Sequence, residues 1–402
     1  EPLELLPALA AFPGAALVQV PDPTMPVTLV GLEPSIELRI APDGTVVRSD
    51  GRPCDPDPVM AIGTFVHEAP TATAAFPVRG GVIGYLAYEL GHWTVPHIVR
   101  RAPVEPLAVL RRYDPLWVYE HNARRWSRLG RDDGNQLAAL RSARAAADDA
   151  TPLDPAPLTP PWTAPTHAAV LDRIHAHLLA GDIYQANLTQ PYSAPLTAPA
   201  WVLCQRLARR HPVPYVAYFD LGDAQIVANS PEMFLRVRER AIETRPIKGT
   251  RPRAADVAAD QKLAAELAAD EKERAEHIMI VDLERNDLGR VCEIGSVRVD
   301  SLMAVESHPS VHHLVSSVRG RLRADVTLPD LLRATFPGGS ITGAPKQRAM
   351  QLLAELEPWP RGPYCGAFGV FDPHGDLELG LAIRTAVVRG GRVRWHAGGG
   401  IV

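Results

Sequence analysis

Short strand-like segments separated by turn residues fill residues 214–247 and constrain the fold more than any other feature of the chain. Turn signals such as Leu221-Gly222-Asp223 separate the apolar runs, which lie at residues 215–219, 225–229, 234–237 and 241–247. Strands joined by such short connections pair antiparallel, so this pattern predicts an antiparallel meander. The meander is broken at Ser230-Pro231-Glu232, which leaves Glu232 at a strand junction one hairpin away from Lys248.

The pattern of the first third of the chain also predicts strands joined by turns. A hairpin is expected at residues 36–48 and further strands at residues 82–88 and 117–119. Six prolines lie within residues 149–165, a composition typical of a linker or surface crossing. A chain of 402 residues is expected to form one large composite domain or two domains. We therefore divide it into an N-terminal region (1–148), a proline-rich linker (149–165) and a C-terminal region (166–402).

The C-terminal region alternates between helical and strand-like patterns. Residues 166–179 predict a helix, and residues 183–192 a strand whose alternate positions Gln185, Asn187 and Thr189 are polar. Residues 254–282 are rich in Ala, Leu, Glu and Lys and predict one long helix. Two strands within residues 297–318 and a capped helix beginning at Thr327 are expected to follow.

Lys248 is the first candidate for chemistry. It follows the apolar Ile247 and precedes Gly249, whose missing Cβ allows a ligand or another backbone to come close. A lysine that loses its hydration in such a place has a lowered pKa and can act as a nucleophile. From this stretch alone, however, the favoured interpretation is that Lys248 is an ordinary surface lysine at a strand end.

Glu273 and Glu276 fall near the end of the long predicted helix, where acidic residues oppose the helix dipole. A hydrated cation such as Mg²⁺ would explain them. Ion pairs with Lys272, Arg274 or Arg285 are the alternative.

Three further stretches favour the binding of carboxylates. The glycine-rich residues 336–346 lead into a helix whose start is lined by Ser340 and Thr342, but they lack the Gly-Lys-Ser/Thr ending of a nucleotide-binding loop. Arg384 interrupts an apolar strand and needs a carboxylate partner. The triple glycine at residues 398–400 can offer successive backbone N–H groups to an anion.

Composition excludes several classes of function. The net charge is -4 without a basic stripe, which argues against nucleic-acid binding. The apolar runs are too short for a membrane span and no signal peptide is evident, so a cytoplasmic protein is expected. The four cysteines are scattered without metal-ligand spacing, and we attach no chemistry to them.

An ordered set of motifs resembles the chorismate-utilising enzymes, and within them the aminodeoxychorismate synthase component I family. These motifs are GDIYQANLTQ (residues 181–190), PIKGT (246–250), Glu276-His277 with Asp282, RNDLGR (285–290), FPGGSITGAPK (336–346), AIRT (382–385) and GGGIV (398–402). The resemblance implies an anthranilate-synthase-like α/β fold of the α+β type. Two large, mostly antiparallel sheets would pack face to face with helices outside, and both halves of the chain would contribute strands.

Two positions choose the reaction within this resemblance. Anthranilate synthases usually have alanine at the position of Lys248, and ammonia then adds directly to C2 of the chorismate ring. In aminodeoxychorismate enzymes the lysine is thought to attack C2, expel the C4 hydroxyl and leave when ammonia enters C4. Isochorismate and salicylate synthases have a water-activating lysine at the position of Gln185, and an amide cannot serve as that base.

The resemblance also implies individual roles. Lys248 would be the nucleophile, Glu232 the general acid/base, and His313 a neighbour of the reacting ring. Glu276 would bind Mg²⁺, and the two substrate carboxylates would be held by Gly249, Thr250, Thr342, Tyr364, Arg384, Gly399 and Gly400. Relatives normally continue past the triple glycine into a segment with a second metal-binding glutamate and a lysine. Because this sequence ends at Val402, its Mg²⁺ site is expected to be half supplied.

The resemblance further implies a glutaminase partner that supplies ammonia, for the synthesis of 4-aminobenzoate and folate. Two alternatives stay open. The chain could be an anthranilate synthase component I, which aminates C2 of the same substrate. It could instead be a non-catalytic homologue that binds a glutaminase.

Overall fold

The computed structural model describes residues 1–70, 81–131, 136, 138, 158 and 160–402. Most of the predicted linker at 149–165 lies outside these residues, as does the end of the predicted N-terminal region. No helix in the described ranges is both long enough and apolar enough to cross a membrane.

Two large antiparallel sheets form the body of the molecule. Among the described residues, sheet A has ten strands, in the order β17 (Gly343–Ala344), β9 (Gln185–Pro195), β21 (Arg392–Ile401), β20 (Thr385–Arg389), β11 (Gln225–Ser230), β10 (Tyr215–Asp220), β1 (Ala16–Val20), β2 (Val27–Gly31), β7 (Leu116–Glu120) and β8 (Arg125–Leu129). Sheet B has eleven, in the order β14 (Ile247–Pro252), β16 (Val311–Arg321), β13 (Ala241–Arg245), β12 (Met233–Arg238), β19 (Leu377–Leu381), β18 (Ala367–Phe371), β5 (Val82–Leu86), β6 (Ala108–Tyr113), β3 (Pro34–Ile40) and β4 (Val46–Arg48), with β15 (Arg298–Ser307) paired to β16. Strands from residues 1–148 and from residues 166–402 occur in both sheets.

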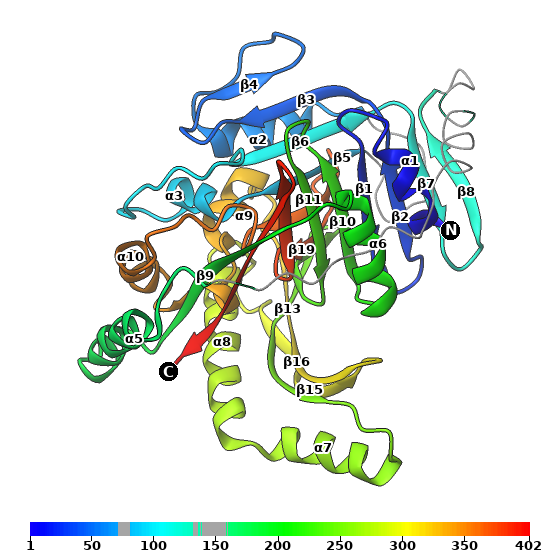
Figure 1. Ribbon diagram of the computed structural model, residues 1–402. Coiled ribbons are helices and arrows are strands. Elements are labelled where there is room, and N and C mark those ends of the chain that lie inside the picture. The colour runs from blue at the N-terminus through cyan, green and yellow to red at the C-terminus, as the bar shows by residue number, and fades with distance from the viewer. Residues whose placement is uncertain (71–80, 132–135, 137, 139–157, 159) are drawn as a thin grey trace.

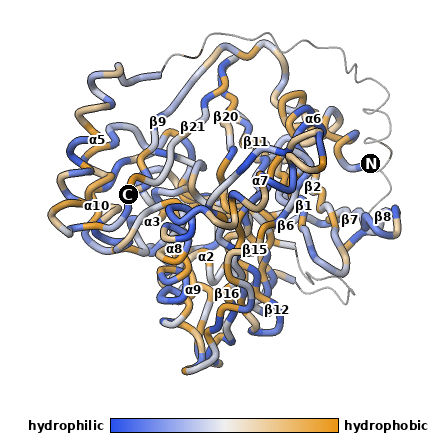
Figure 2. The backbone as a smooth tube through the Cα atoms, turned by 90° about the horizontal axis from the view of Figure 1, so that it is seen from below, coloured by the Kyte–Doolittle hydropathy of each residue, from blue (hydrophilic) through white to orange (hydrophobic). Residues whose placement is uncertain are grey.

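The sheets pack face to face because each has an apolar inner face. Side chains from β1, β10 and β11 of sheet A meet side chains from β5, β6 and β18 of sheet B in one buried cluster. In Figure 2 the sheets are seen from below, with β9, β21, β20 and β11 on one side and β12, β15 and β16 on the other. The predicted pair of large antiparallel sheets is therefore confirmed.

Helices cover the outer faces (Figure 1). α1 (Leu6–Leu9) and α6 (Ala200–Arg210) pack on sheet A, and α5 (Ala164–Leu179) packs near β9. The helices that contribute side chains to the outer core of sheet B are α2 (Pro58–His67), α8 (Glu271–Gly289), α9 (Leu328–Thr335) and α10 (Lys346–Leu356). Further helical elements are the short α3 (Gly91–Thr94) and the 3-10 turns η1 (Pro2–Leu5), η2 (Tyr88–Leu90) and η3 (Gly339–Ile341).

The single helix expected at residues 254–282 is two helices, α7 (Val257–Ala269) and α8. Asp270 separates them and caps α8, since its side chain accepts a hydrogen bond from the backbone N–H of Glu273. Glu273 therefore lies in the first turn of a helix, where the dipole favours a carboxylate. The dipole argument for a cation beside Glu273 and Glu276 was wrong, because propensity alone does not reveal a capped break.

The predicted meander at residues 214–247 is divided between the two sheets. β10 and β11 belong to sheet A, whereas β12 and β13 belong to sheet B, so the break at Ser230-Pro231-Glu232 is a crossover from one sheet to the other. A second crossover returns from β19 to β20 through residues 382–384. Arg384 thus lies between two strands, not inside the single strand that the sequence predicted.

The two crossovers lie side by side. The backbone N–H of Leu381 donates to the carbonyl of Glu232 (3.0 Å), and the N–H of Asn229 donates to the carbonyl of Arg384 (3.2 Å). Glu232 and Arg384, which are far apart in sequence, are consequently held at the same place between the sheets.

Candidate functional site

A cavity of about 1100 Å³ opens beside these crossovers. Its walls come from β9, β20 and β21 of sheet A and from β14 and β16 of sheet B. The predicted site residues that line it are Glu232, Lys248, Thr250, His313, Tyr364, Arg384, Gly399 and Gly400. Residues from six separate stretches of sequence therefore meet in one cavity of the size that holds a small ligand.

A β-bulge turns β14 toward the cavity. Gly249 has no partner on β16, because Lys248 pairs with Leu314 and Thr250 pairs with the next residue, His313. Gly249 has a positive φ of 81°, and a Cβ there would lie 3.0 Å from Leu267 and 3.3 Å from a carboxylate oxygen of Glu273. The position therefore requires glycine, and the bulge allows Lys248 and Thr250 to line the same cavity.

Lys248 and Glu232 both contact Ser340, which lies in η3. The Lys248 Nζ donates to the Ser340 carbonyl (3.1 Å), and the Ser340 hydroxyl donates to Glu232 Oε1 (2.8 Å). Glu232 and Ser340 are each 5% exposed, so these contacts are shielded from bulk water. The candidate nucleophile and the candidate acid/base are thus joined through one residue.

The environment of Glu232 suits proton transfer near neutral pH. Burial raises its pKa to about 7, against the opposing effects of the Ser340 hydrogen bond, the Lys248 charge and the backbone N–H of Ile247. A carboxyl group with such a pKa can donate a proton and then accept one at neutral pH.

Arg384 is exposed to the cavity and lies at a positive φ of 50°, an uncommon conformation for a residue with a side chain. Desolvation lowers the pKa of its guanidinium group, and no described carboxylate lies close enough to pair with it. An arginine that lacks its own anionic partner inside a cavity is suited to binding an anionic ligand.

Neutral rings surround the same space. Burial, together with the electrostatic effects of His308 and Arg384, lowers the pKa of His313 to about 4, so its ring is neutral while Nδ1 contacts the Thr250 hydroxyl (3.0 Å). Tyr364 stacks on His396 with ring centroids 5.4 Å apart. Neither ring nitrogen of His396 has a described hydrogen-bond partner.

Thr342 and Gly249 are not among the cavity-lining residues. Thr342 is fully buried, and its hydroxyl donates to the carbonyls of Gly338 (3.0 Å) and Gly339 (3.2 Å) within the glycine-rich loop. The structure thus brings Thr342 next to the site as a support of this loop. A direct contact of Thr342 with substrate stays a prediction.

Glu276 lies one helical turn after Glu273 on α8, and its carboxylate is 3.7 Å from the Nζ of the exposed Lys272. This is the ion pair considered as the alternative to a cation. Within the described ranges, no group of three or more His, Cys, Asp or Glu side chains forms a closed metal site. Glu273, one turn earlier on the same helix, lies beside Gly249 and 3.6 Å from Arg251. Two carboxylates one turn apart nevertheless fit Mg²⁺, which commonly takes one or two protein carboxylates together with waters and substrate oxygens.

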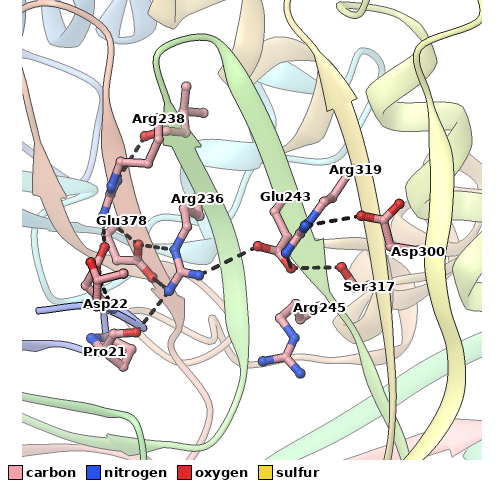
Figure 3. A network of polar contacts seen from close by, with 12 residues as sticks. Pro21, Asp22, Arg236, Arg238, Glu243, Arg245, Asp300, Ser317, Arg319 and Glu378 are labelled. Carbon is pink, nitrogen blue, oxygen red and sulfur yellow. Dashed lines mark hydrogen bonds and ion pairs between the residues drawn. The ribbon is translucent and has the colours of Figure 1, made fainter. Parts of the chain in front are cut away.

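A second polar cluster lies farther along β12 and is closed (Figure 3). Glu378 is 1% exposed and accepts hydrogen bonds from Arg236 (2.7 and 2.9 Å), Arg238 (2.9 Å) and the Tyr215 hydroxyl (2.8 Å). Arg236 also lies 3.6 Å from Glu243. The carboxylate at the centre of this cluster has its protein partners in place.

Residues 38–402 match the sequence profile of chorismate binding enzymes. The chain belongs to this family. An aminodeoxychorismate synthase component 1 from Klebsiella aerogenes is 41% identical, over 84% of this chain and 77% of that protein. An enzyme of the same name from Escherichia coli strain K12 is 38% identical, over 86% and 78% of the two chains. An anthranilate synthase component 1 from Streptomyces coelicolor is 40% identical, over 87% and 74%.

Solved structures agree with this membership. The crystal structure of anthranilate synthase component I from Streptococcus pneumoniae matches with a TM-score of 0.80 at 30% identity, over 94% of this chain and 87% of that one. The menaquinone-specific isochorismate synthase of Escherichia coli shares the fold, with a TM-score of 0.73 at 19% identity over 100% and 86%. The predicted anthranilate-synthase-like fold is confirmed, and the chain is a chorismate-utilising enzyme.

Sequence reasoning missed two features of this chorismate binding enzyme. Ser340 was expected only to help hold a carboxylate at a helix start, whereas its side chain bonds to Glu232 and its carbonyl accepts from Lys248. His396 was not singled out at all, although it lies two residues before the triple glycine (residues 398–400), which was a candidate anion site. Each was missed because its partners come from distant parts of the sequence.

Proposed function

We propose that this chorismate-utilising enzyme is an aminodeoxychorismate synthase component I, a transferase that replaces the C4 hydroxyl of chorismate with an amino group. The observation that carries the proposal is that Lys248 lies in the cavity, where its Nζ is 3.1 Å from the Ser340 carbonyl oxygen. The Ser340 hydroxyl in turn contacts Glu232, so Ser340 connects the two side chains. Relatives that aminate C2 are about as similar as relatives named for aminodeoxychorismate synthesis, so overall identity does not choose between them. Lys248 supports amination at C4, because direct addition of ammonia to C2 needs no amine at this place.

In the first step, the Lys248 amine, after giving one proton to solvent, attacks C2 of chorismate. The C2–N bond forms, the C1=C2 electron pair moves to C1–C6, the C5=C6 pair moves to C4–C5, and the C4–O bond breaks. Glu232 gives its proton to the departing oxygen, which leaves as water. The pKa of about 7 keeps a useful fraction of Glu232 protonated at neutral pH.

In the second step, ammonia attacks C4 and the electron shifts run in reverse. The C4–N bond forms, the two ring double bonds return to their original positions, and the C2–N bond breaks to release the Lys248 amine. The Glu232 carboxylate accepts the proton that the new C4 ammonium group loses. The net reaction converts chorismate and ammonia to 4-amino-4-deoxychorismate and water, and both side chains are restored.

Substrate orientation is assigned to the remaining cavity residues. Arg384 and the backbone of Gly399 and Gly400 would bind the carboxylates, and Thr250 and Tyr364 would complete their contacts. His313, held neutral, would lie beside the ring. Glu276 with Glu273 would hold Mg²⁺, which supplies positive charge for a substrate carboxylate.

Ammonia is proposed to come from a glutaminase partner, in keeping with the name "component 1" of the relatives. The product would serve the synthesis of 4-aminobenzoate and folate, and the enzyme would work in the cytoplasm.

A product assay tests the proposal. The full-length protein is incubated with chorismate, Mg²⁺ and ammonium, and products are separated with and without an added aminodeoxychorismate lyase. We expect 4-aminobenzoate only when the lyase is present. Fluorescent anthranilate formed without the lyase would instead identify C2 amination, the second candidate, which the Streptomyces coelicolor relative favours. No product at any ammonium concentration would support a non-catalytic homologue.

Mass spectrometry tests the covalent step separately. The protein is treated with chorismate and Mg²⁺ while ammonia is withheld, then digested. The peptide that contains Lys248 should gain the mass of chorismate less one water. An unmodified peptide, under conditions where added ammonium restores turnover, would refute the lysine adduct.

A further inference from the structure

Ser340 presents two different polar groups to the two residues that carry the proposed chemistry. Its backbone carbonyl accepts from the Lys248 Nζ at 3.1 Å, and its hydroxyl donates to Glu232 Oε1 at 2.8 Å. The carbonyl is fixed by the backbone, whereas the hydroxyl depends on the side chain. Substitution of the side chain therefore separates the two contacts.

The backbone around Ser340 is held on both sides by buried groups. The N–H of Gly339 donates to Glu284 Oε1 (3.1 Å), and the carbonyl of Ile341 accepts from Arg361 Nη1 (2.9 Å). The hydroxyl of Thr342 donates to the carbonyls of residues 338 and 339. Because the neighbouring residues are bonded to the protein interior, the polar groups of Ser340 are left to face the cavity in a fixed position.

We propose that Ser340 is a positioning residue, which holds the Lys248 amine and the Glu232 carboxyl group in the relative orientation that the amination requires. This inference rests on the proposed function. An amine that gives one N–H to the Ser340 carbonyl keeps its lone pair free to point at the ring carbon. A carboxyl group that accepts from the Ser340 hydroxyl is fixed in the plane from which it reaches the leaving oxygen.

The hydroxyl also affects when Glu232 carries its proton. A hydrogen bond to a carboxylate is stronger than one to a neutral acid, so the Ser340 hydroxyl favours the ionised form and opposes the effect of burial. The other groups that act on Glu232 are the Lys248 charge and the Ile247 N–H on β14, and the charge of Glu232 in turn helps to raise the pKa of the buried Glu284 on α8. Loss of the hydroxyl should therefore raise the pKa of Glu232 and move the alkaline fall of activity to higher pH.

The test compares Ser340→Ala, Ser340→Cys and Ser310→Ala with the wild-type protein. Ser310 is exposed at the rim of the same cavity, and its carbonyl accepts from the Arg253 backbone N–H. The pH dependence of kcat/KM for C4 amination is measured at saturating ammonium, together with kcat and KM for chorismate. Far-ultraviolet circular dichroism checks that each variant is folded.

We expect Ser340→Ala to move the alkaline limb upward by about one pH unit, the size that loss of one hydrogen bond to a charged group allows. We expect its kcat to fall by roughly tenfold to a hundredfold, with KM changed by less than about threefold. Ser340→Cys, with a weaker donor, should give a smaller shift in the same direction. Ser310→Ala should leave the profile unchanged.

An alkaline limb at the wild-type pH in Ser340→Ala would overturn the inference, as would a loss expressed only in KM. Failure of the proposed function looks different. In that case the wild-type protein itself forms anthranilate or no product, and no C4-amination profile exists to be shifted.

Discussion

The two polar clusters along β12 resemble each other in composition and differ in how completely they are paired. Figure 3 shows the buried Glu378 between Arg236 and Arg238, and Glu378 also accepts a hydrogen bond from the Tyr215 hydroxyl. In the cavity, Glu232 has one side-chain donor, Ser340, and Arg384 has no described carboxylate partner. Only a few residues of one strand and its crossover separate the two.

The difference follows from the cost of burying charge. A buried ion that lacks partners loses hydration without compensation, so a protein normally pairs it, as it pairs Glu378. Where a charged side chain in a cavity has no protein partner, a ligand of opposite charge can supply the missing interaction instead. We therefore expect substitutions in the closed cluster to reduce stability, and substitutions in the open cluster to reduce catalysis or binding with little loss of stability.

The largest effect is expected for Lys248→Ala. Loss of the proposed nucleophile should lower the rate of C4 amination by on the order of 10⁶-fold, as the loss of a covalent nucleophile does elsewhere. Any remaining product should carry nitrogen at C2, because ammonia would then have to add to the ring directly. Product chromatography measures both quantities. An unchanged rate of C4 amination would show that Lys248 is not the nucleophile.

Glu232→Gln should lower kcat by about 10³-fold, within the range of general acid–base catalysis. In the wild-type protein, the acid form of Glu232 is populated below its pKa of about 7 and lost above it, so activity should fall as the pH rises through 7. The variant has no proton to lose and should not show this limb. A limb near pH 7 that persists in Glu232→Gln would assign it to another group.

Glu378→Gln tests the closed cluster. Removing the charge leaves Arg236 and Arg238 without their main anionic partner, and we expect the free energy of unfolding to fall by about 3 kcal/mol. Urea denaturation measures the change. Arg319→Ala removes a half-exposed arginine that pairs with Glu243 and Asp300; it is the matched control and should cost less than about 1 kcal/mol. If both variants lost a similar amount of unfolding free energy, burial would not determine how much these ion pairs contribute to stability.

The smallest effect is expected for Arg384→Gln. Loss of one charged contact to a carboxylate should raise KM for chorismate about thirtyfold. The free energy of unfolding should stay the same or rise slightly, because a partly desolvated charge without a partner is removed. Arg392→Gln, an exposed position on β21, should change neither quantity. A lower free energy of unfolding without a change in KM would show that Arg384 stabilises the fold, as the residues around Glu378 do, and does not bind substrate.

Local patterns predicted much of the secondary structure. The hairpin at residues 36–48, the two strands within residues 297–318 and the capping box at Thr327 all follow from spacing and turn chemistry, and the structure contains them. The long helix at residues 254–282 was wrong because a single capping aspartate, Asp270, restarts the helix in a stretch of uniformly high helix propensity. Local sequence named Lys248 and Gly249 only as candidates, because a glycine after a lysine at a strand end fits a surface lysine equally well; the role of nucleophile came from the resemblance to the family.

The sequence by itself determined the kinds of side chain that the site can use, through motifs that stay together along the chain. Only the tertiary structure decided that Glu232 and Arg384 lie next to each other between the sheets. The strand-breaking pattern around each residue is compatible with a turn within one sheet and with a crossover between two sheets. The choice between them depends on which apolar faces meet, and that is a property of the packed sheets, not of any local stretch. The role of Ser340 arises in the same way, since a hydroxyl and a carbonyl acquire direction only when the loop that carries them is fixed by its distant partners.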